Sequence, residues 1–426
     1  MSLLAIKEKT FNRCFVSLFL ITILGMAAFN YSVNAFGVFS MPSIKGYNDV
    51  RFVENTRIYK TFLIKNQKID GLLLGSSRIE ESMRPLPAAW PKMQTYNMAM
   101  PGASIHEIQR NLQHANAITP LKQVLIGLDF FMFSAFMESA GDFSESYFSV
   151  DETDKKKSDL YVLRTYTNIL LSSDALTKSK KTIRDSKKSI TPSHEDNGMT
   201  SIAAHTAAVK NNADLYKVFD SFEKSYFRKN GFWLNGPNAT FTTEGKNGHS
   251  TYDDYRALLD TVYRNNIPAS FVIPPLHEYM LFGLDGIGLW PAYLQWKQKI
   301  TTLNEEVAAQ YQQTPRPLWD FAVVNAMTRE WLPEDPRLTT PKNGMHWFWD
   351  PAHVKPSFGD EMQQRVFVTQ QQDIGTMLTQ QNIAQHLQQQ TAALAQAQRE
   401  DAAVREHIKK KLQSLNVWQH ISADIH

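Results

Sequence analysis

An apolar segment close to the N-terminus constrains this chain more than any other feature. Residues 14–31 carry no charged side chain, and Lys7, Lys9 and Arg13 precede them. As a helix the segment would reach roughly 27 Å at about 1.5 Å per residue, close to the thickness of a bilayer's hydrocarbon core. The basic flank, residues 1–13, predicts a cytoplasmic N-terminus and an exported body. We expect an uncleaved single-pass anchor, and a signal peptide cleaved near Val33-Asn34-Ala35 is the alternative.

Composition excludes several classes of protein and site. The net charge of +3 comes from 45 basic and 42 acidic residues mixed along the chain, so no charged field argues for a nucleic-acid partner. The single cysteine, Cys14, lies inside the apolar segment, which leaves no intrachain disulfide and no cysteine metal site. The histidines are scattered without ligand spacing, and no phosphate-binding glycine loop is present. We therefore expect no metal and no cofactor.

Five short apolar runs predict the strands of a sheet, and they follow a connector at residues 32–47. The stretches between several of them have helical patterns, such as residues 252–265. Strands that alternate with helices indicate an α/β fold with a parallel, doubly wound sheet, which we place at residues 48–365. The predicted strands are residues 69–75, 95–100, 123–129, 269–273 and 318–324.

Two segments depart from this pattern. Residues 134–245 predict an inserted helical subdomain, and its stretch 177–189 is strongly basic. That stretch is either a solvated helix face or a contact with anionic lipid headgroups or an acidic glycan. Residues 366–426 form a glutamine- and alanine-rich tail with apolar positions at helical spacing. We expect a helix that packs on a partner or on the body, and not a long coiled coil.

A serine follows the first predicted strand, where open α/β sheets place their sites. Ser77 ends the run Gly75-Ser76-Ser77, and its position favours it over Ser76 as a nucleophile. Towards the other end of the domain, Asp350 and His353 stand three residues apart in Trp349-Asp350-Pro351-Ala352-His353. His353 is the candidate general base for Ser77, and Asp350 would hold the imidazole in the required tautomer.

The order of these motifs resembles the SGNH, or GDSL-like, hydrolase superfamily. Residues 75–77 look like its first block, residues 97–104 like its second, and residues 350–353 like its last. The resemblance covers roughly residues 65–365 and is closest to membrane-anchored bacterial proteins that assist O-acylation of envelope polymers, as in alginate acetylation and D-alanylation. It implies an SGNH-like fold, a triad of Ser77, Asp350 and His353, and oxyanion donors at the amides of Ser77 and Gly102.

One position departs from that family's pattern. The third block normally supplies an asparagine side chain to the oxyanion hole, and this chain has Asp129 there. An ionised carboxylate would repel an oxyanion, and loss of one donor typically costs on the order of 2.7–4 kcal/mol. Either Asp129 is neutralised by burial, or it points elsewhere, or the protein is weakly active or inactive.

Three further residues are candidate substrate contacts. Arg78 directly follows the candidate nucleophile and would pair with a substrate anion or with a nearby carboxylate. His277 follows the fourth predicted strand, and the alternative for it is an ordinary loop histidine. His346 has aromatic neighbours, Trp347 and Trp349, which would form either a sugar-stacking platform or part of the core.

These features predict an extracytoplasmic serine-dependent acyl transfer, with acetyl as the expected group, to or from a cell-envelope polysaccharide. The residues do not separate a transferase from an esterase. The resemblance implies a bacterial inner-membrane location and a membrane-bound acyltransferase partner. The alternative is a non-catalytic accessory protein that binds glycan and assembles a membrane complex for polysaccharide modification, and Asp129 favours it.

Overall fold

The computed structural model describes residues 3–51, 55–137, 139–203, 206, 225–234, 240–245, 248–330, 345–368 and 374–418, with side chains from residue 9 onwards. The chain divides into two compact units. Unit 1 comprises residues 1–68 and 142–193, and unit 2 comprises residues 69–141 and 194–426. The predicted insertion is thus shared between the units, since its residues 142–193 group with the N-terminal segment.

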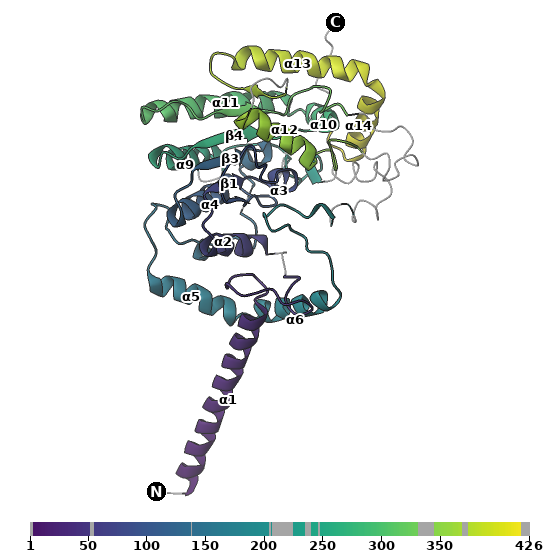
Figure 1. Cartoon of the computed structure of the whole chain (residues 1–426). Helices are drawn as coiled ribbons and strands as arrows, with labels where there is room; N and C mark the ends of the chain where they lie inside the picture. The colour runs from purple at the N-terminus through teal and green to yellow at the C-terminus, as the bar shows by residue number, and fades with distance from the viewer. Residues whose placement is uncertain are drawn as a thin grey trace. The chain divides into compact units, whose positions relative to one another are not determined.

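Unit 2 contains a six-stranded sheet in the order β2-β1-β3-β4-β5-β6 (Figure 1). The first five strands are parallel, and only the pair β5–β6 is antiparallel. The prediction of an α/β fold with a largely parallel sheet is therefore confirmed. The strands are β1 (Gly71–Leu74), β2 (Thr95–Asn97), β3 (Gln123–Gly127), β4 (Ala269–Ile273), β5 (Leu318–Asp320) and β6 (Thr376–Met377).

The five predicted strands lie where the apolar runs placed them, and most of them end earlier. Every residue of β1, β4 and β5 is buried, which is why these strands read as continuous apolar runs without alternation. The run at 123–129 is shortened because the chain turns after Gly127 into the 3-10 helix η1 (Phe130–Phe133). Because β1 to β5 are parallel, the residues that follow them lie at one edge of the sheet.

The helices of unit 2 form layers against this sheet. Helices α4 (Ile105–Ile118), α9 (Thr251–Arg264) and α11 (Trp290–Gln310) pack side by side, and α3 (Ser77–Ser82) packs against α12 (Pro356–Phe367). The connection through α3 leads from β1 to β2, towards one end of the strand order. The connections through α4, α9 and α11 all lead towards the other end. Right-handed crossovers therefore place α3 on the other face of the sheet.

The glutamine- and alanine-rich segment is helical and packs on the body of unit 2. Helix α13 (Ile383–Glu400) contacts α10 (Glu278–Gly286) and α11, and α14 (Ala402–Ser414) contacts α10. A buried polar cluster joins α13 to the sheet, because the Asp320 carboxylate pairs with Lys297 Nζ at 2.6 Å and with His386 Nε2 at 2.8 Å. Breaking such a buried pair is strongly destabilising, so this cluster fixes the tail in place.

Unit 1 is built around the long helix α1 (Leu3–Val33), with α2 (Thr56–Asn66), the 3-10 helix η2 (Glu145–Tyr147), α5 (Asp159–Leu170) and α6 (Ser173–Lys187). From Lys9 to Val33, α1 is long and apolar enough to cross a membrane by length and composition. Its last turns pack against α5 and α6. Unit 1 has a small hydrophobic core, which consists of Phe36, Val38, Ile58, Phe62 and Ala175.

Candidate active site

Ser77 stands at the first position of α3, directly after β1. Gly75 makes the turn with φ at +149°, and a Cβ atom there would lie 2.5 Å from Ile79 Cγ1. Only glycine fits both the backbone conformation and this close approach. Ser76 then caps α3 by accepting a hydrogen bond from the Arg78 amide at 3.2 Å. The turn leaves Ser77 half-buried between two buried neighbours.

Asp350 and His353 lie together at the tip of a short hairpin. An antiparallel bridge pairs Phe348 with Val354, and the Trp349 amide donates to the His353 carbonyl at 2.9 Å. At the tip, Asp350 Oδ1 accepts hydrogen bonds from the amides of Ala352 and His353 at 2.8 and 2.9 Å. The carboxylate therefore stabilises the turn and also faces the ring that it orients.

The structure brings the three predicted catalytic residues into one hydrogen-bonded chain. Ser77 Oγ lies 2.8 Å from His353 Nε2, across 276 residues of sequence. His353 Nδ1 lies 2.9 Å from Asp350 Oδ2. When the ring is neutral and its one proton lies on Nδ1, donated to Asp350, Nε2 can accept the serine proton. The distances are those expected of a nucleophile, its base and the group that orients the base.

A fourth side chain, Glu81, belongs to this site and was missed by the sequence reasoning. Its Oε1 lies 3.8 Å from His353 Nε2. Glu81 follows Ser77 by four residues on α3, so the two share one face of the helix. That spacing was a usable signal, although a lone glutamate on a helix is usually solvated. The imidazole of His353 is therefore held between two carboxylates.

These surroundings set the protonation of the base. Burial alone would lower the pKa of His353, but the charges of Asp350 and Glu81 outweigh it and raise the pKa to about 9. Burial raises the pKa of Glu81 to about 7, and His353 opposes that rise. The base is consequently protonated near neutral pH in the resting site. It accepts a proton readily only at alkaline pH or when Glu81 carries no charge.

Asp129 is placed at the end of β3 with its carboxylate committed to two partners. Its Oδ2 accepts a hydrogen bond from Ser76 Oγ at 2.5 Å, and its Oδ1 pairs with Arg78 Nη1 at 2.7 Å. Burial disfavours the charged guanidinium, but Asp129 outweighs it and raises the pKa of Arg78. Arg78 thus pairs with a nearby carboxylate, and this ion pair lies buried beneath the turn that carries Ser77.

The second resembling block follows β2 at the same edge. The Met100 amide donates to the Gly75 carbonyl at 3.0 Å, which lays the turn at Gly102 beside the turn that carries Ser77. Gly102 has φ at +59°. The side chain of Asn97 is buried and donates to the carbonyls of Ile79 and Met83 at 2.9 and 2.7 Å. It braces α3 against β2, so its role is structural.

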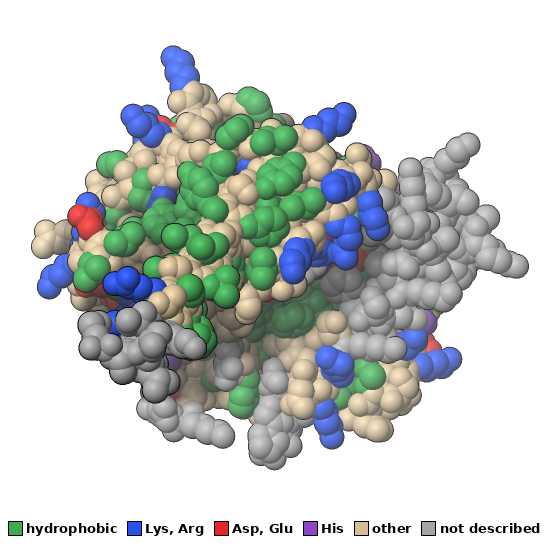
Figure 2. Space-filling model, turned by 90° about the horizontal axis from the view of Figure 1, so that it is seen from below, with side chains coloured by type: hydrophobic (Ala, Val, Ile, Leu, Met, Phe, Trp, Pro, Cys, Tyr) green, Lys and Arg blue, Asp and Glu red, His purple; other side chains and the backbone are tan. Residues whose placement is uncertain are grey.

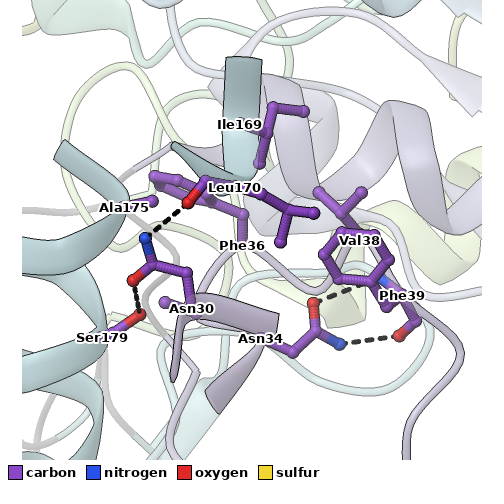
Figure 3. Close-up of a pocket in the computed structure, with 10 residues that line it drawn as sticks. Asn30, Asn34, Phe36, Val38, Phe39, Ile169, Leu170, Ala175 and Ser179 are labelled. Atoms are coloured by element: carbon purple, nitrogen blue, oxygen red, sulfur yellow. Dashed lines mark hydrogen bonds between the residues drawn. The ribbon is translucent and has the colours of Figure 1, made fainter. Parts of the chain in front are cut away.

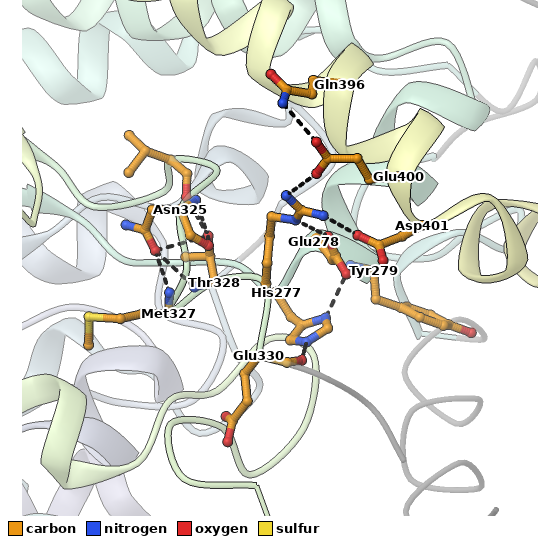
Figure 4. Close-up of polar contacts among 12 residues, drawn as sticks. His277, Glu278, Tyr279, Asn325, Met327, Thr328, Glu330, Gln396, Glu400 and Asp401 are labelled. Atoms are coloured by element: carbon orange, nitrogen blue, oxygen red, sulfur yellow. Dashed lines mark hydrogen bonds and ion pairs between the residues drawn. The ribbon is translucent and has the colours of Figure 1, made fainter. Parts of the chain in front are cut away.

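His277 and His346 lie in different surroundings. His277 caps α10, because its Nδ1 accepts a hydrogen bond from the Tyr279 amide at 3.1 Å (Figure 4). Its Nε2 donates a hydrogen bond to the Glu330 carbonyl at 2.8 Å. Burial lowers its pKa to about 4, so the ring stays neutral with both nitrogens engaged. His346 is exposed, and its ring packs against Trp347. Of the two, only His346 offers its ring to solvent.

Three groups at this site have metal-ligand chemistry. Glu81, Asp350 and His353 offer ligand atoms that all lie within 4.8 Å of one another. Both nitrogens of His353 are already hydrogen-bonded, to Asp350 and to Ser77. A metal on Nε2 would displace the bond to Ser77, and a metal on Nδ1 would displace the bond to Asp350. Metal binding by His353 and the intact triad therefore exclude each other.

No protein-family model matches the chain, and no curated protein matches it. The function is therefore argued from the site itself.

Proposed function

We propose that this chain is a serine-dependent acyl-transfer protein with an SGNH-like fold. Its acyl group, acetyl in our expectation, would pass through Ser77 to or from a hydroxyl of a cell-envelope polysaccharide. The observation that carries the proposal is the chain of hydrogen bonds from Ser77 Oγ through His353 to Asp350, at 2.8 and 2.9 Å.

The chemistry follows from these positions. His353 Nε2 takes the hydroxyl proton while Ser77 Oγ attacks the acyl carbonyl, and the same proton then leaves with the departing alcohol. In the second half, His353 deprotonates the acceptor hydroxyl, which attacks the acyl-serine. The bond from Ser77 Oγ to the acyl carbon breaks, and His353 returns the proton to Ser77 Oγ. Asp350 stabilises the imidazolium in both halves. Water in place of the sugar hydroxyl turns the same cycle into hydrolysis.

The position of the site in the sheet supports the SGNH likeness. Ser77 follows β1, and Asp129 follows β3, the neighbouring strand. The chain steps from β1 to β2 on one side and to β3 on the other, so the site lies at a topological switch point, where open α/β sheets bind ligands. The blocks around Gly75, Gly102 and His353 stand at this edge in the order that the family uses.

The location of the protein is part of the proposal. We infer a bacterial inner-membrane protein that crosses once through α1, with the N-terminus in the cytoplasm and both units outside. Support comes from the apolar length of Lys9–Val33 and from the basic residues before it. A tethered acyl-transfer protein would be positioned to receive acyl groups from a membrane-bound acyltransferase.

A second candidate function is a glycan-binding accessory role without catalysis. Asp129 favours it, because this residue stands where the family has an asparagine donor and its carboxylate is engaged with Ser76 and Arg78. The raised pKa of His353 also favours this role, because a histidine that is protonated near neutral pH does not act as a base.

The test uses the full chain in detergent with a fluorophosphonate probe and p-nitrophenyl acetate. We expect labelling that is lost in Ser77→Ala and kept in Ser146→Ala, the control at an equally half-buried serine in unit 1. The probe forms a covalent bond with the nucleophile. The labelling is measured from pH 7 to about pH 9, the pKa of His353. A folded protein that stays unlabelled over this range would refute the proposed catalytic activity and support the accessory role. Equal labelling of wild type and Ser77→Ala would refute Ser77 as the nucleophile.

A further inference from the structure

Unit 1 holds the end of α1 through buried polar contacts (Figure 3). Asn30 is buried, its Nδ2 donates to the Leu170 carbonyl of α5 at 2.8 Å, and its Oδ1 accepts from Ser179 Oγ of α6 at 3.1 Å. Four residues later in the chain, Asn34 closes a loop with the backbone of Phe39. Irregular backbone such as this loop is not found exposed to lipid in the hydrocarbon region, so we place the end of the hydrocarbon core near Asn30.

The length of α1 fixes how far unit 1 can stand from a membrane. Arg13 is the last charged residue before the apolar stretch, and Asn30 is the first buried residue after it. A helix rises about 1.5 Å per residue, so these two residues are roughly 26 Å apart, whereas the hydrocarbon core is about 30 Å thick. If α1 crosses a bilayer, this short span therefore brings α5 and α6 within reach of the lipid headgroups.

Helices α5 and α6 lie across the end of α1 (Figure 1). On α5, Leu160 is 75% exposed and Leu163 is 61% exposed, next to exposed Arg164. Such apolar side chains on a short helix beside a membrane span are typical of interfacial helices. Tyr31, at the last turn of α1, is 47% exposed and stands where aromatic residues gather at membrane interfaces.

The charge of α6 matches an anionic surface. Small side chains face its packed side, and the exposed positions are rich in lysine and arginine. Figure 2, seen from below, shows hydrophobic side chains gathered on one face with Lys and Arg side chains around them. Each such basic residue near an anionic bilayer contributes about 1 kcal/mol, or about fivefold, to binding. The exposed basic residues of α6 and its C-cap are Lys180, Arg184, Lys187 and Lys188.

We propose that α5 and α6 dock on the surface of an anionic phospholipid bilayer, with Leu160 and Leu163 entering the headgroup layer and the α6 lysines contacting lipid phosphates. The inference rests on the membrane crossing of α1 in the proposed function and is independent of acyl transfer. A lipid surface is favoured over an acidic glycan because the length of α1 brings these helices to the headgroups.

The test places one dye on α5 in the full chain. Cys14 is the only cysteine, so Cys14→Ser with Leu163→Cys gives a single labelling site. The protein is reconstituted in nanodiscs of phosphatidylcholine with or without phosphatidylglycerol, each carrying a headgroup-proximal doxyl quencher. Val368→Cys, which replaces an apolar residue 51% exposed in unit 2, is the matched control site.

We expect quenching at position 163 that exceeds quenching at 368 and strengthens with phosphatidylglycerol. Lys180→Glu, Lys187→Glu and Lys188→Glu together should lower the docked-to-undocked ratio at least about fivefold. The same lysine-to-glutamate substitutions at three exposed lysines of unit 2, Lys92, Lys299 and Lys410, should leave the docked-to-undocked ratio unchanged.

Three results would overturn the proposal. One is failure of the protein to enter nanodiscs, and another is equal quenching at both sites. The third is a dye signal at position 163 that does not change with lipid composition but changes on addition of alginate. That result would indicate that the exposed basic residues of α6 bind glycan.

Discussion

The charge of Glu81 should control the pH at which His353 works as a base. Its Oε1 lies 3.8 Å from His353 Nε2, and both side chains are shielded, 17% and 8% exposed. Two unit charges at that distance interact by about 1.1 kcal/mol at the dielectric constant of water and about 4.4 kcal/mol at an effective value of about 20. At 1.36 kcal/mol per unit of pKa, this corresponds to roughly 0.8–3.2 units. We expect Glu81→Gln to lower the pKa of His353 by about one to two units, since some screening remains.

The sign of the effect follows from the role of the histidine. A base must be neutral to act, so the rate rises as pH passes upward through the pKa of His353, which is about 9 in the intact site. Glu81→Gln removes a charge that stabilises the imidazolium. The rising limb should therefore move to lower pH, and the variant should be faster than wild type near pH 7.

The assay is kcat/KM for p-nitrophenyl acetate across the alkaline range, with the Ser77→Ala rate subtracted. Glu80→Gln is the matched control, because Glu80 is also buried on α3 but pairs with His194 at 2.9 Å. A Glu81→Gln limb that coincides with wild type, or an equal shift in Glu80→Gln, would refute the reasoning.

Two other predictions concern the frame of the site. Arg78→Met should destabilise the fold by about 3–5 kcal/mol in urea unfolding, because it leaves the buried Asp129 carboxylate without its only described cationic partner. Arg84→Met, which breaks an ion pair with a half-exposed arginine, should cost at most about 1 kcal/mol. Equal losses would contradict this. Gly359→Ala should lower kcat/KM about tenfold to a hundredfold, because a Cβ there meets the backbone of α3 and moves the triad, and Gly141→Ala, which meets nothing within 4 Å, should be neutral; unchanged activity in both would contradict it.

The sequence predicted the parallel sheet because buried strands such as β1 and β4 are short, continuous apolar runs with turn residues behind them. It also placed Ser77 and His353 at strand and loop positions that the structure brings to 2.8 Å. Such positions follow from the rule that parallel strands end at one edge.

Other features depend on contacts that no local pattern records. The pairing of Arg78 with Asp129 joins residues 51 apart in the chain, and either could equally have faced solvent. The grouping of residues 142–193 with the N-terminal segment depends on packing between distant helices. Glu81 was missed because its importance arises only when His353 arrives from another part of the chain.

Asp350 and His353 lie on one small hairpin, which is closed by the bridge between Phe348 and Val354. Their positions relative to each other are therefore set within the hairpin. A shift of that hairpin would widen the gap to Ser77 while leaving the tautomer of the imidazole unchanged. Of the two hydrogen bonds of the triad, the bond between His353 and Asp350 is therefore secured locally, and the bond between Ser77 and His353 depends on how the hairpin packs against α3.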